Sequence, residues 1–271
     1  MNYQPSLPEH NDNVSHQHPL REFLFLLAGL AACALAVFWA LGLAVDVVAD
    51  HVSPEIETQI NRAVSLRLVA KESFAPRQEA MLQALTDELK QCAGVSQPIQ
   101  IHMRQATEAN AAALPGGHVI VHSGLLDKVA SRNGLAFVLA HELAHFKHRD
   151  HLRALGRNVL LIALSAALSG AHSDVTQLLV PVNLAGYAQY SQQREEAADR
   201  EALRTVACLF GHAGGATEFL EAMRATEDRS STPAHYFASH PRTELRITAL
   251  NSAIRDLRLP VKPAQPLDKG Q

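Results

Sequence analysis

Residues 137–145 read FVLAHELAH, and the last five of them carry the chemistry. In an α-helix, residues four positions apart share a face, so His141 and His145 can point at one metal ion. Imidazole nitrogens suit zinc, and a catalytic zinc ion keeps three protein ligands and one water molecule. Glu142 lies where its carboxylate can take a proton from that water without binding the metal. The spacing therefore predicts a zinc site together with its general base.

The neighbours of this motif favour a buried helix over an exposed helix that carries two histidines by chance. Positions 137–140 and 143–144 are all apolar. Burying a polar side chain without a partner costs roughly 2–7 kcal/mol, and a metal ion would supply the missing partners.

A third ligand is predicted in the sequence REEAAD at 194–199. Glu195 and Asp199 are four residues apart on a helix predicted for residues 191–210. Glu195 would bind the zinc ion, and Asp199 would accept the free ring N–H of a ligating histidine, which orients the ring and raises its basicity. The alternative is a solvated acidic helix face.

His151 is a competing candidate for the third ligand, because His141, His145 and His151 match the metzincin spacing HExxHxxGxxH. In that signature the glycine lets the chain leave the helix. Here His148 holds the glycine position, and left-handed backbone is costly for a residue with a Cβ. A continuing helix would carry His151 about 15 Å along the axis from His141, at 1.5 Å per residue. We therefore do not expect His151 to bind the metal.

Several ordered motifs resemble those of the HtpX/BepA/Ste-type zinc metallopeptidases, metallopeptidase family forty-eight. They are the HELAH motif with the later ExxAD helix, then Asn110-Ala111, Pro115-Gly116-Gly117 and Gly124-Leu125-Leu126, and finally Ser239-His240-Pro241 with Arg246. The resemblance extends over about residues 75–250. It implies a zinc-dependent endopeptidase of the gluzincin type, with one Zn²⁺ per chain and polypeptide substrates.

Members of that family act on membrane or misfolded envelope proteins, or process prenylated peptides. This sequence has one clear transmembrane segment where other members have several, which favours the quality-control branch. A catalytically silent, chaperone-like binding module on the same fold is the alternative, and the presence of every catalytic group disfavours it.

Periodicity predicts a small sheet ahead of the HELAH helix. Ile99, Ile101 and Met103 recur at alternate positions, and Val119 and Val121 do so after a Pro-Gly-Gly turn at 115–117. Helices are predicted from Ser53-Pro54-Glu55, around residues 81–89 and from about residue 131 onward. Together with the resemblance, this indicates an α+β fold: a mostly helical zincin-like peptidase domain with a small sheet, preceded by one transmembrane helix.

Two further site assignments have alternatives. Gly117, His118, Val119 and Ile120 could bind substrate, since zinc peptidases often add a peptide strand at a sheet edge, but an ordinary core strand explains them equally. His240 could approach the metal, take a catalytic role at the developing oxyanion or gate the site; it could also be a loop histidine before a helix. It is the only obvious fourth ligand if the zinc were structural.

The stretch from Phe23 to Val45 contains no charged residue. At about 1.5 Å per residue, a helix of that length covers a hydrocarbon core of roughly 30 Å. A cleavable signal peptide is a weaker alternative, because this apolar run is longer than the usual ~7–15 residues. A lipobox-like run ending at Cys33 is weaker too, because the apolar run continues well past Cys33. We expect a disordered polar tail at 1–22, a transmembrane anchor at 23–48, the peptidase domain at 53–256 and a loose tail at 257–271.

Two later apolar stretches, Val159–Leu168 and Val175–Tyr190, are too short or too interrupted to span a membrane. We expect buried or amphipathic helices there, and the alternative is a pair of helices that dip into the same membrane.

Charge and cysteine usage restrict the setting. A formal net charge of −3 and a pI of about 6.6 disfavour nucleic-acid binding. Cys92 and Cys208 could form a disulfide, but two unpaired structural thiols are favoured. Arg21, at the N-terminal side of the span, favours a single-pass protein of a bacterial inner membrane with its peptidase domain in the periplasm. The sequence does not indicate an oligomeric state.

Overall fold

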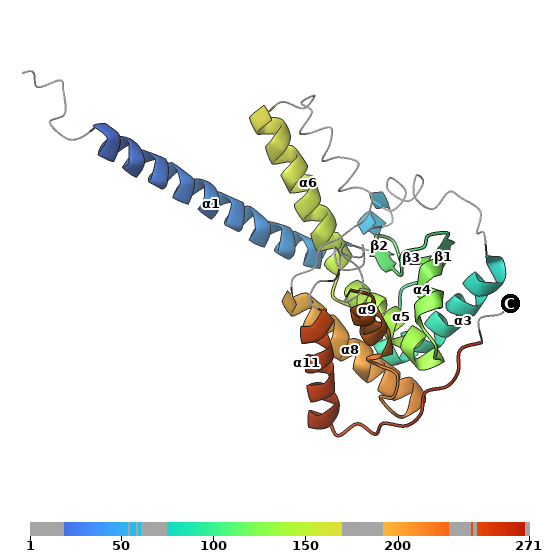
Figure 1. Ribbon diagram of the computed structural model, residues 1–271. Coiled ribbons are helices and arrows are strands. Elements are labelled where there is room, and N and C mark those ends of the chain that lie inside the picture. Colours follow the sequence, from blue (N-terminus) through green and yellow to red (C-terminus); the bar gives the residue numbers. More distant parts are fainter. Residues whose placement is uncertain are drawn as a thin grey trace, which may run out of the picture. The chain divides into compact units, whose positions relative to one another are not determined.

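The computed structural model describes residues 19–53, 55–57, 59–60, 75–169, 192–227, 240 and 243–268. The chain divides into two compact units, Met1–Asp46 and Val47–Gln271. The first holds most of α1 (Pro19–His51). The second holds the last turn of α1 and every other described element (Figure 1).

α1 is one uninterrupted helix and contains the whole stretch predicted as an anchor, 23–48. Its apolar side chains are exposed along most of its length, Trp39 at 71% for example. Among the described residues it is the one helix that is long and apolar enough to cross a membrane.

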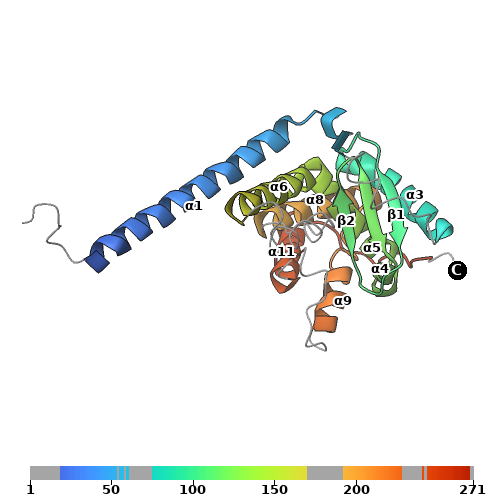
Figure 2. The same cartoon turned by 90° about the horizontal axis from the view of Figure 1, so that it is seen from above.

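The second unit contains a three-stranded sheet in the order β1-β3-β2, formed by β1 (Gln100–Arg104), β2 (Ala111–Leu114) and β3 (His118–His122). β1 runs parallel to β3 and β2 runs antiparallel to it, so β2 is an edge strand (Figure 2). Helix α3 (Pro76–Ala93) contacts the sheet at β1, and α5 (Arg132–Lys147) contacts it at β2. The alternation seen in the sequence is confirmed, because Ile101, Met103, Val119 and Val121 are buried.

The edge strand β2 was not predicted, because Ala111–Leu114 reads AAAL and alanine has little preference for strands. The predicted turn joins it to β3, with Gly116 and Gly117 both at positive φ. This arrangement shows that the predicted substrate strand is wrong. β3 pairs with a strand on each side, so no peptide can add along Gly117, His118, Val119 and Ile120.

The other helices are α4 (Ser123–Lys128), α6 (Asp150–Ser169), α8 (Gln192–Phe210), α9 (Glu218–Glu227) and α11 (Thr243–Asp256). α5 is the centre of the domain: every residue from Asn133 to Phe146 is buried, and the helix contacts α3, α8, α9 and β2. Ser131 caps its first turn, and the carboxylate of Glu218 accepts hydrogen bonds from the Ala130 and Ser131 amides beside it.

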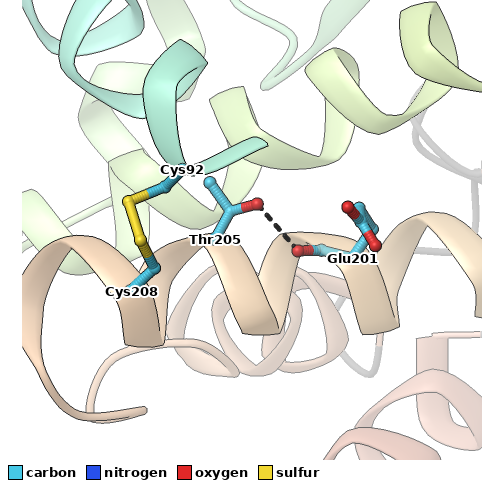
Figure 3. Close-up of a disulfide and its surroundings, with 4 residues drawn as sticks. All are labelled: Cys92, Glu201, Thr205 and Cys208. Atoms are coloured by element: carbon cyan, nitrogen blue, oxygen red, sulfur yellow. Dashed lines mark hydrogen bonds between the residues drawn. A yellow bond between two sulfur atoms is a disulfide. The ribbon is translucent and has the colours of Figure 1, made fainter. Parts of the chain in front are cut away.

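Cys92 and Cys208 form a disulfide, so the expectation of two unpaired thiols is wrong (Figure 3). It joins the last turn of α3 to the last turn of α8, with the two Cα atoms 5.9 Å apart. A cross-link between residues 116 positions apart typically stabilises a fold by about 2–4 kcal/mol. The bond therefore fixes α8, the helix that carries Glu195 and Asp199.

The C-terminal segment predicted as a loose tail is ordered as far as residue 268, so that prediction is also wrong. The Pro260 and Gln265 carbonyls accept hydrogen bonds from Ala213 and Arg132, and the Leu267 amide donates to Ala130. Leu259 and Leu267 pack against the hydrophobic core.

The apolar stretch Val159–Leu168 forms the second half of α6, yet none of the side chains from 153 to 167 is buried in the described structure. Of the expected buried or amphipathic helix, the buried form is therefore wrong there, and the amphipathic form stays a prediction. The second apolar stretch, Val175–Tyr190, lies outside the described residues, as does most of the helix predicted from Ser53.

Candidate metal centre

Three predicted ligands from two helices meet in the buried centre of the domain. His141 and His145 come from successive turns of α5, and Glu195 comes from the first turn of α8. The His141 and His145 Nε2 atoms are 3.1 Å apart, and each is 3.4 Å from a Glu195 carboxylate oxygen. Ligands bound tetrahedrally to zinc at about 2.0–2.1 Å are about 3.3–3.4 Å from one another. The two nitrogens and the carboxylate, which faces His141 with Oε2 and His145 with Oε1, are thus spaced as ligands of one zinc ion.

The ring orientation of each histidine is set by a buried aspartate. The Nδ1 atom of His141 is 3.0 Å from Asp199, the carboxylate predicted for this position. The Nδ1 atom of His145 is 3.0 Å from Asp150, which the sequence analysis did not identify. With Nδ1 protonated toward an aspartate, each ring presents the lone pair of Nε2 to the metal.

Two arginines hold the carboxylates in turn. Arg246 of α11 forms a bidentate pair with Asp199 at 2.7 and 2.8 Å, and its Nη1 atom is 3.1 Å from Glu195. Arg194 of α8 donates to Asp150. Planar guanidinium groups suit such bidentate contacts.

The charges of this centre favour a divalent cation. Four carboxylates are buried there, on Glu142, Asp150, Glu195 and Asp199, and the two arginines compensate two of them. With the histidines neutral, two negative charges are left inside the protein. Buried charge without compensation is strongly unfavourable, and a doubly charged metal ion would balance it.

The pKa values show how strongly the centre attracts positive charge. Burial by itself lowers the pKa of His145, but Asp150 and Glu195 raise it to about 9. Burial raises the pKa of Asp199, but Arg246 and His141 together lower it to about 2. Against its burial, the pKa of Glu195 is held well below its usual range by His240 and His141. A metal ion binding here displaces protons from the histidines.

Glu142 lies beside the ligands and is held by the edge strand. Its Oε2 atom accepts a hydrogen bond of 2.9 Å from the Ala113 amide of β2, and its side chain is buried. This contact fixes one carboxylate oxygen and leaves the other, Oε1, on the side of His240, whose Nε2 atom is 3.9 Å away. Glu142 is thus held beside the metal-binding side chains, and its role as a base stays a prediction.

His240 completes a group of four metal-binding side chains with His141, His145 and Glu195, whose donor atoms all lie within 4.8 Å of one another. Its Nδ1 atom is 2.9 Å from Glu195 and 3.4 Å from His141. Burial lowers the pKa of His240, although the nearby Glu195 acts to raise it. A neutral ring here can donate to Glu195 or offer a lone pair to the metal.

His151 lies outside the centre, as predicted, but the reason given for this was wrong. α5 does not continue: it ends at Lys147, and Arg149 adopts a left-handed φ of 56°. The Arg149 guanidinium donates to the Ala49, Asp50 and Val52 carbonyls, which holds the unfavourable backbone in place. After this reversal Asp150 faces His145, and His151 turns away to Glu57 at 3.0 Å.

Three groups that hold the site, on Asp150, Arg246 and Ala113, carry little signal in the sequence. Asp150 follows the motif by five positions, beyond the end of the helix, so helical spacing gives no reason to choose it. Arg246 had been noted only as part of a C-terminal motif. The Ala113 amide has no signature at all, since any residue offers a backbone N–H.

Comparisons with known proteins agree with this geometry. A sequence profile of peptidase family M48 matches residues 76–254. The chain is 28% identical over 175 residues to the beta-barrel assembly-enhancing protease of Escherichia coli O157:H7, covering 60% of this chain and 36% of that protein. It is 30% identical over 154 residues to the mitochondrial metalloendopeptidase OMA1 of Schizosaccharomyces pombe, covering 55% of this chain and 44% of that protein.

A third relative is covered over more of its length. The protease HtpX homolog of Salinibacter ruber is 28% identical over 194 residues, which are 66% of this chain and 68% of that protein. The chain thus spans less than half the length of the first two relatives.

Proposed function

The chain belongs to peptidase family M48, and from that premise we propose that it is a zinc-dependent endopeptidase of membrane or misfolded envelope proteins. The observation that carries the proposal is the spacing of His141, His145 and Glu195, whose donor atoms lie 3.1–3.4 Å apart in a buried centre. M48 metallopeptidases use zinc, and this group can hold one such ion.

The residues around the ligands have separate roles in the proposed peptide hydrolysis. Zinc, when bound, lowers the pKa of a water molecule to about 7 and polarises the scissile carbonyl. Glu142 takes the proton of the attacking water and then delivers it to the departing amine. The hydrogen bond from Ala113 keeps the carboxylate aimed during both transfers. Asp199 and Asp150 hold the rings of the two histidines.

The edge strand β2 is the proposed binding surface for a substrate. In an antiparallel pair, alternate residues face the partner strand, and the Asn110 carbonyl accepts a hydrogen bond from His122 of β3. The main-chain groups of Ala111 and Ala113 therefore face away from β3, and the Ala113 amide indeed points to Glu142. An extended peptide beside β2 would pass close to the base and the metal ligands.

The disulfide supports a location of the peptidase unit outside the cytoplasm. Structural disulfides persist in oxidising compartments such as the bacterial periplasm and are rare in the cytosol. Cys92 and Cys208 are bonded inside the peptidase unit, which follows α1 in the chain. With α1 as a single transmembrane anchor, we infer that the tail is cytoplasmic and the peptidase unit periplasmic.

The decisive experiment compares Glu142→Gln with wild type and with Glu196→Gln, a control on α8 whose carboxylate accepts a hydrogen bond from Gln192. Zinc content and cleavage of casein, an unstructured protein substrate, are measured together. Glu142→Gln keeps zinc and slows cleavage by about 10²–10⁴-fold, whereas Glu196→Gln changes neither. Retained cleavage by Glu142→Gln refutes the assignment of the base. Zinc-loaded wild type that binds but never cleaves polypeptides supports the chaperone-like module instead.

A further inference from the structure

α6 consists of a buried beginning and a remainder that is partly to fully exposed. Asp150, His151 and Leu152 are 1%, 3% and 5% exposed and belong to the surroundings of the metal centre. From residue 153 to residue 167 no side chain is buried, and beyond its first turns the helix extends away from α5 and α8 (Figure 1). Val159 is 53% exposed and Leu161 is 40% exposed.

The exposed part is strongly apolar. Residues 159–167 read VLLIALSAA and contain no charge, while the charged residues of α6 all lie in its first eight positions, at Asp150, Arg153 and Arg157. Water-exposed apolar surface costs about 25 cal/mol per Å², and contiguous apolar patches on soluble proteins usually mark an interaction site. This half of α6 therefore needs an apolar partner.

The start of α6 is attached to the end of the candidate membrane helix. The Arg149 guanidinium binds the Ala49, Asp50 and Val52 carbonyls, at and just after the last turn of α1. Arg153, one turn further on, is paired with Asp50. All of these contacts lie within the second unit. α6 therefore begins where a membrane-spanning α1 would leave the bilayer.

We propose that the apolar half of α6 contacts the phospholipid bilayer from which α1 emerges, an inference that rests on the proposed anchoring through α1. At about 1.5 Å per residue, the stretch 159–167 reaches roughly 13 Å, enough to enter the interfacial layer and the adjoining acyl chains. Arg157, at the border of the stretch, suits the headgroup level. Since α6 follows the metal-binding helix directly, this contact holds the active site at the membrane surface and favours membrane-bound or membrane-emerging polypeptides as substrates.

Tryptophan quenching in vesicles tests the proposal on the full-length chain. The sequence has a single tryptophan, Trp39 in α1, so that wild type reports on the anchor alone. In a Trp39→Phe background, Leu161→Trp places the reporter on α6. Leu257→Trp is the matched control, because Leu257 is 44% exposed and Leu161 is 40% exposed. Each protein is reconstituted in phosphatidylglycerol–phosphatidylcholine vesicles with brominated or ordinary acyl chains.

The indole of Leu161→Trp should lose fluorescence in brominated vesicles to an extent comparable with Trp39 of wild type, whereas that of Leu257→Trp should not. Zinc content equal to wild type confirms that the variants fold, and Val159→Trp gives a second reporter in the same apolar stretch, on the opposite side of the helix. The proposal is overturned if Trp39 of wild type is quenched but the indoles of Leu161→Trp and Val159→Trp are not. In that case protein, and not lipid, covers this part of α6. Trp39 tests the anchor separately: an unquenched Trp39 refutes the membrane anchoring itself.

Discussion

α5 and α6 are consecutive helices, separated only by His148 and Arg149, and they lie in opposite environments. Every residue of α5 from Asn133 to Phe146 is buried, whereas no described side chain of α6 beyond Leu152 is. Both helices are rich in apolar residues. Apolar composition therefore indicates that a helix avoids water, but it does not indicate whether protein or another apolar phase surrounds the helix.

The polar residues tell the two helices apart. In α5, His141, Glu142 and His145 lie in the buried second half of the helix, and each has a specific buried partner. In α6 the charged residues lie in the first two turns, and the rest has none. Polar groups in the middle of an apolar helix need partners from other elements, which identifies a core helix. A helix whose apolar end is free of charges can be surrounded by lipid.

The largest expected effect is the loss of zinc, which should follow substitution of His145 on α5 but not of His151 on α6. His145→Ala removes a ligand, and zinc content falls from one ion per chain to nearly none; Glu195→Gln does the same. His151→Ala, at a position equally buried, keeps its zinc because the side chain faces Glu57. The measurement is zinc stoichiometry of the purified variants. A metal-free His151→Ala protein would replace the gluzincin arrangement with a metzincin-like site.

The next effect compares packing. Leu135→Ala on α5 removes a side chain with 0% exposure and lowers the free energy of unfolding by about 2–5 kcal/mol. Leu161 on α6 is partly exposed, so Leu161→Ala should change the free energy of unfolding by no more than about 0.5 kcal/mol. Urea unfolding of both zinc-loaded variants in detergent, followed by circular dichroism, gives the two values. Equal losses would mean that α6 is packed against protein.

A smaller effect concerns the aspartate at the start of α6. Asp150→Asn weakens the orientation of His145, and zinc affinity falls by about 10–100-fold; Asp199→Asn has the same effect through His141. Asp50→Asn is the control, because Asp50 pairs with Arg153 and its side chain is 54% exposed. Titration with metal buffers measures the three affinities. Wild-type affinity in Asp150→Asn would leave His145 positioned by helix packing alone.

The smallest effect tests the junction between the two helices. Arg149→Ala and Arg149→Gly both remove the three hydrogen bonds to the Ala49, Asp50 and Val52 carbonyls. Only glycine adopts the left-handed φ of 56° without a penalty from a Cβ atom. Arg149→Ala should therefore be less stable than Arg149→Gly by about 1–2 kcal/mol. Equal unfolding midpoints would show that the chain passes from α5 to α6 by another backbone conformation once the arginine is lost.

The sequence predicted what depends on local spacing. His141 and His145 share a helix face by the geometry of one turn, and Glu195 and Asp199 do so on α8, so each pair could be placed before any tertiary contact was known. The mostly helical character, the long apolar helix and two of the three strands follow from the same local periodicity. The family resemblance then joined the two helices into one site.

What could not be predicted depends on contacts between distant segments. The Cys92–Cys208 bond requires α3 and α8 to lie side by side, and no spacing in the sequence gives that distance. β2 exists because its alanines pair with β3, although their own strand preference is weak. The prolines of residues 257–268 predicted a loose tail. The carbonyls and amides of this segment nevertheless form hydrogen bonds with residues 130–133 and 213.

The Arg149 contacts have a consequence for the modularity of this enzyme. By hydropathy the anchor stops near residue 48 and the domain starts near residue 53, which makes the connection between them look like a convenient place to cut. The carbonyls that Arg149 binds belong to Ala49, Asp50 and Val52, so a soluble fragment starting at residue 53 would lack all three. A fragment that keeps all three carbonyls begins at or before Ala49, inside α1. Anchor and enzyme therefore overlap in sequence. Replacing α1 by another transmembrane helix of equal length and hydropathy would not preserve the contacts that Arg149 makes with its end.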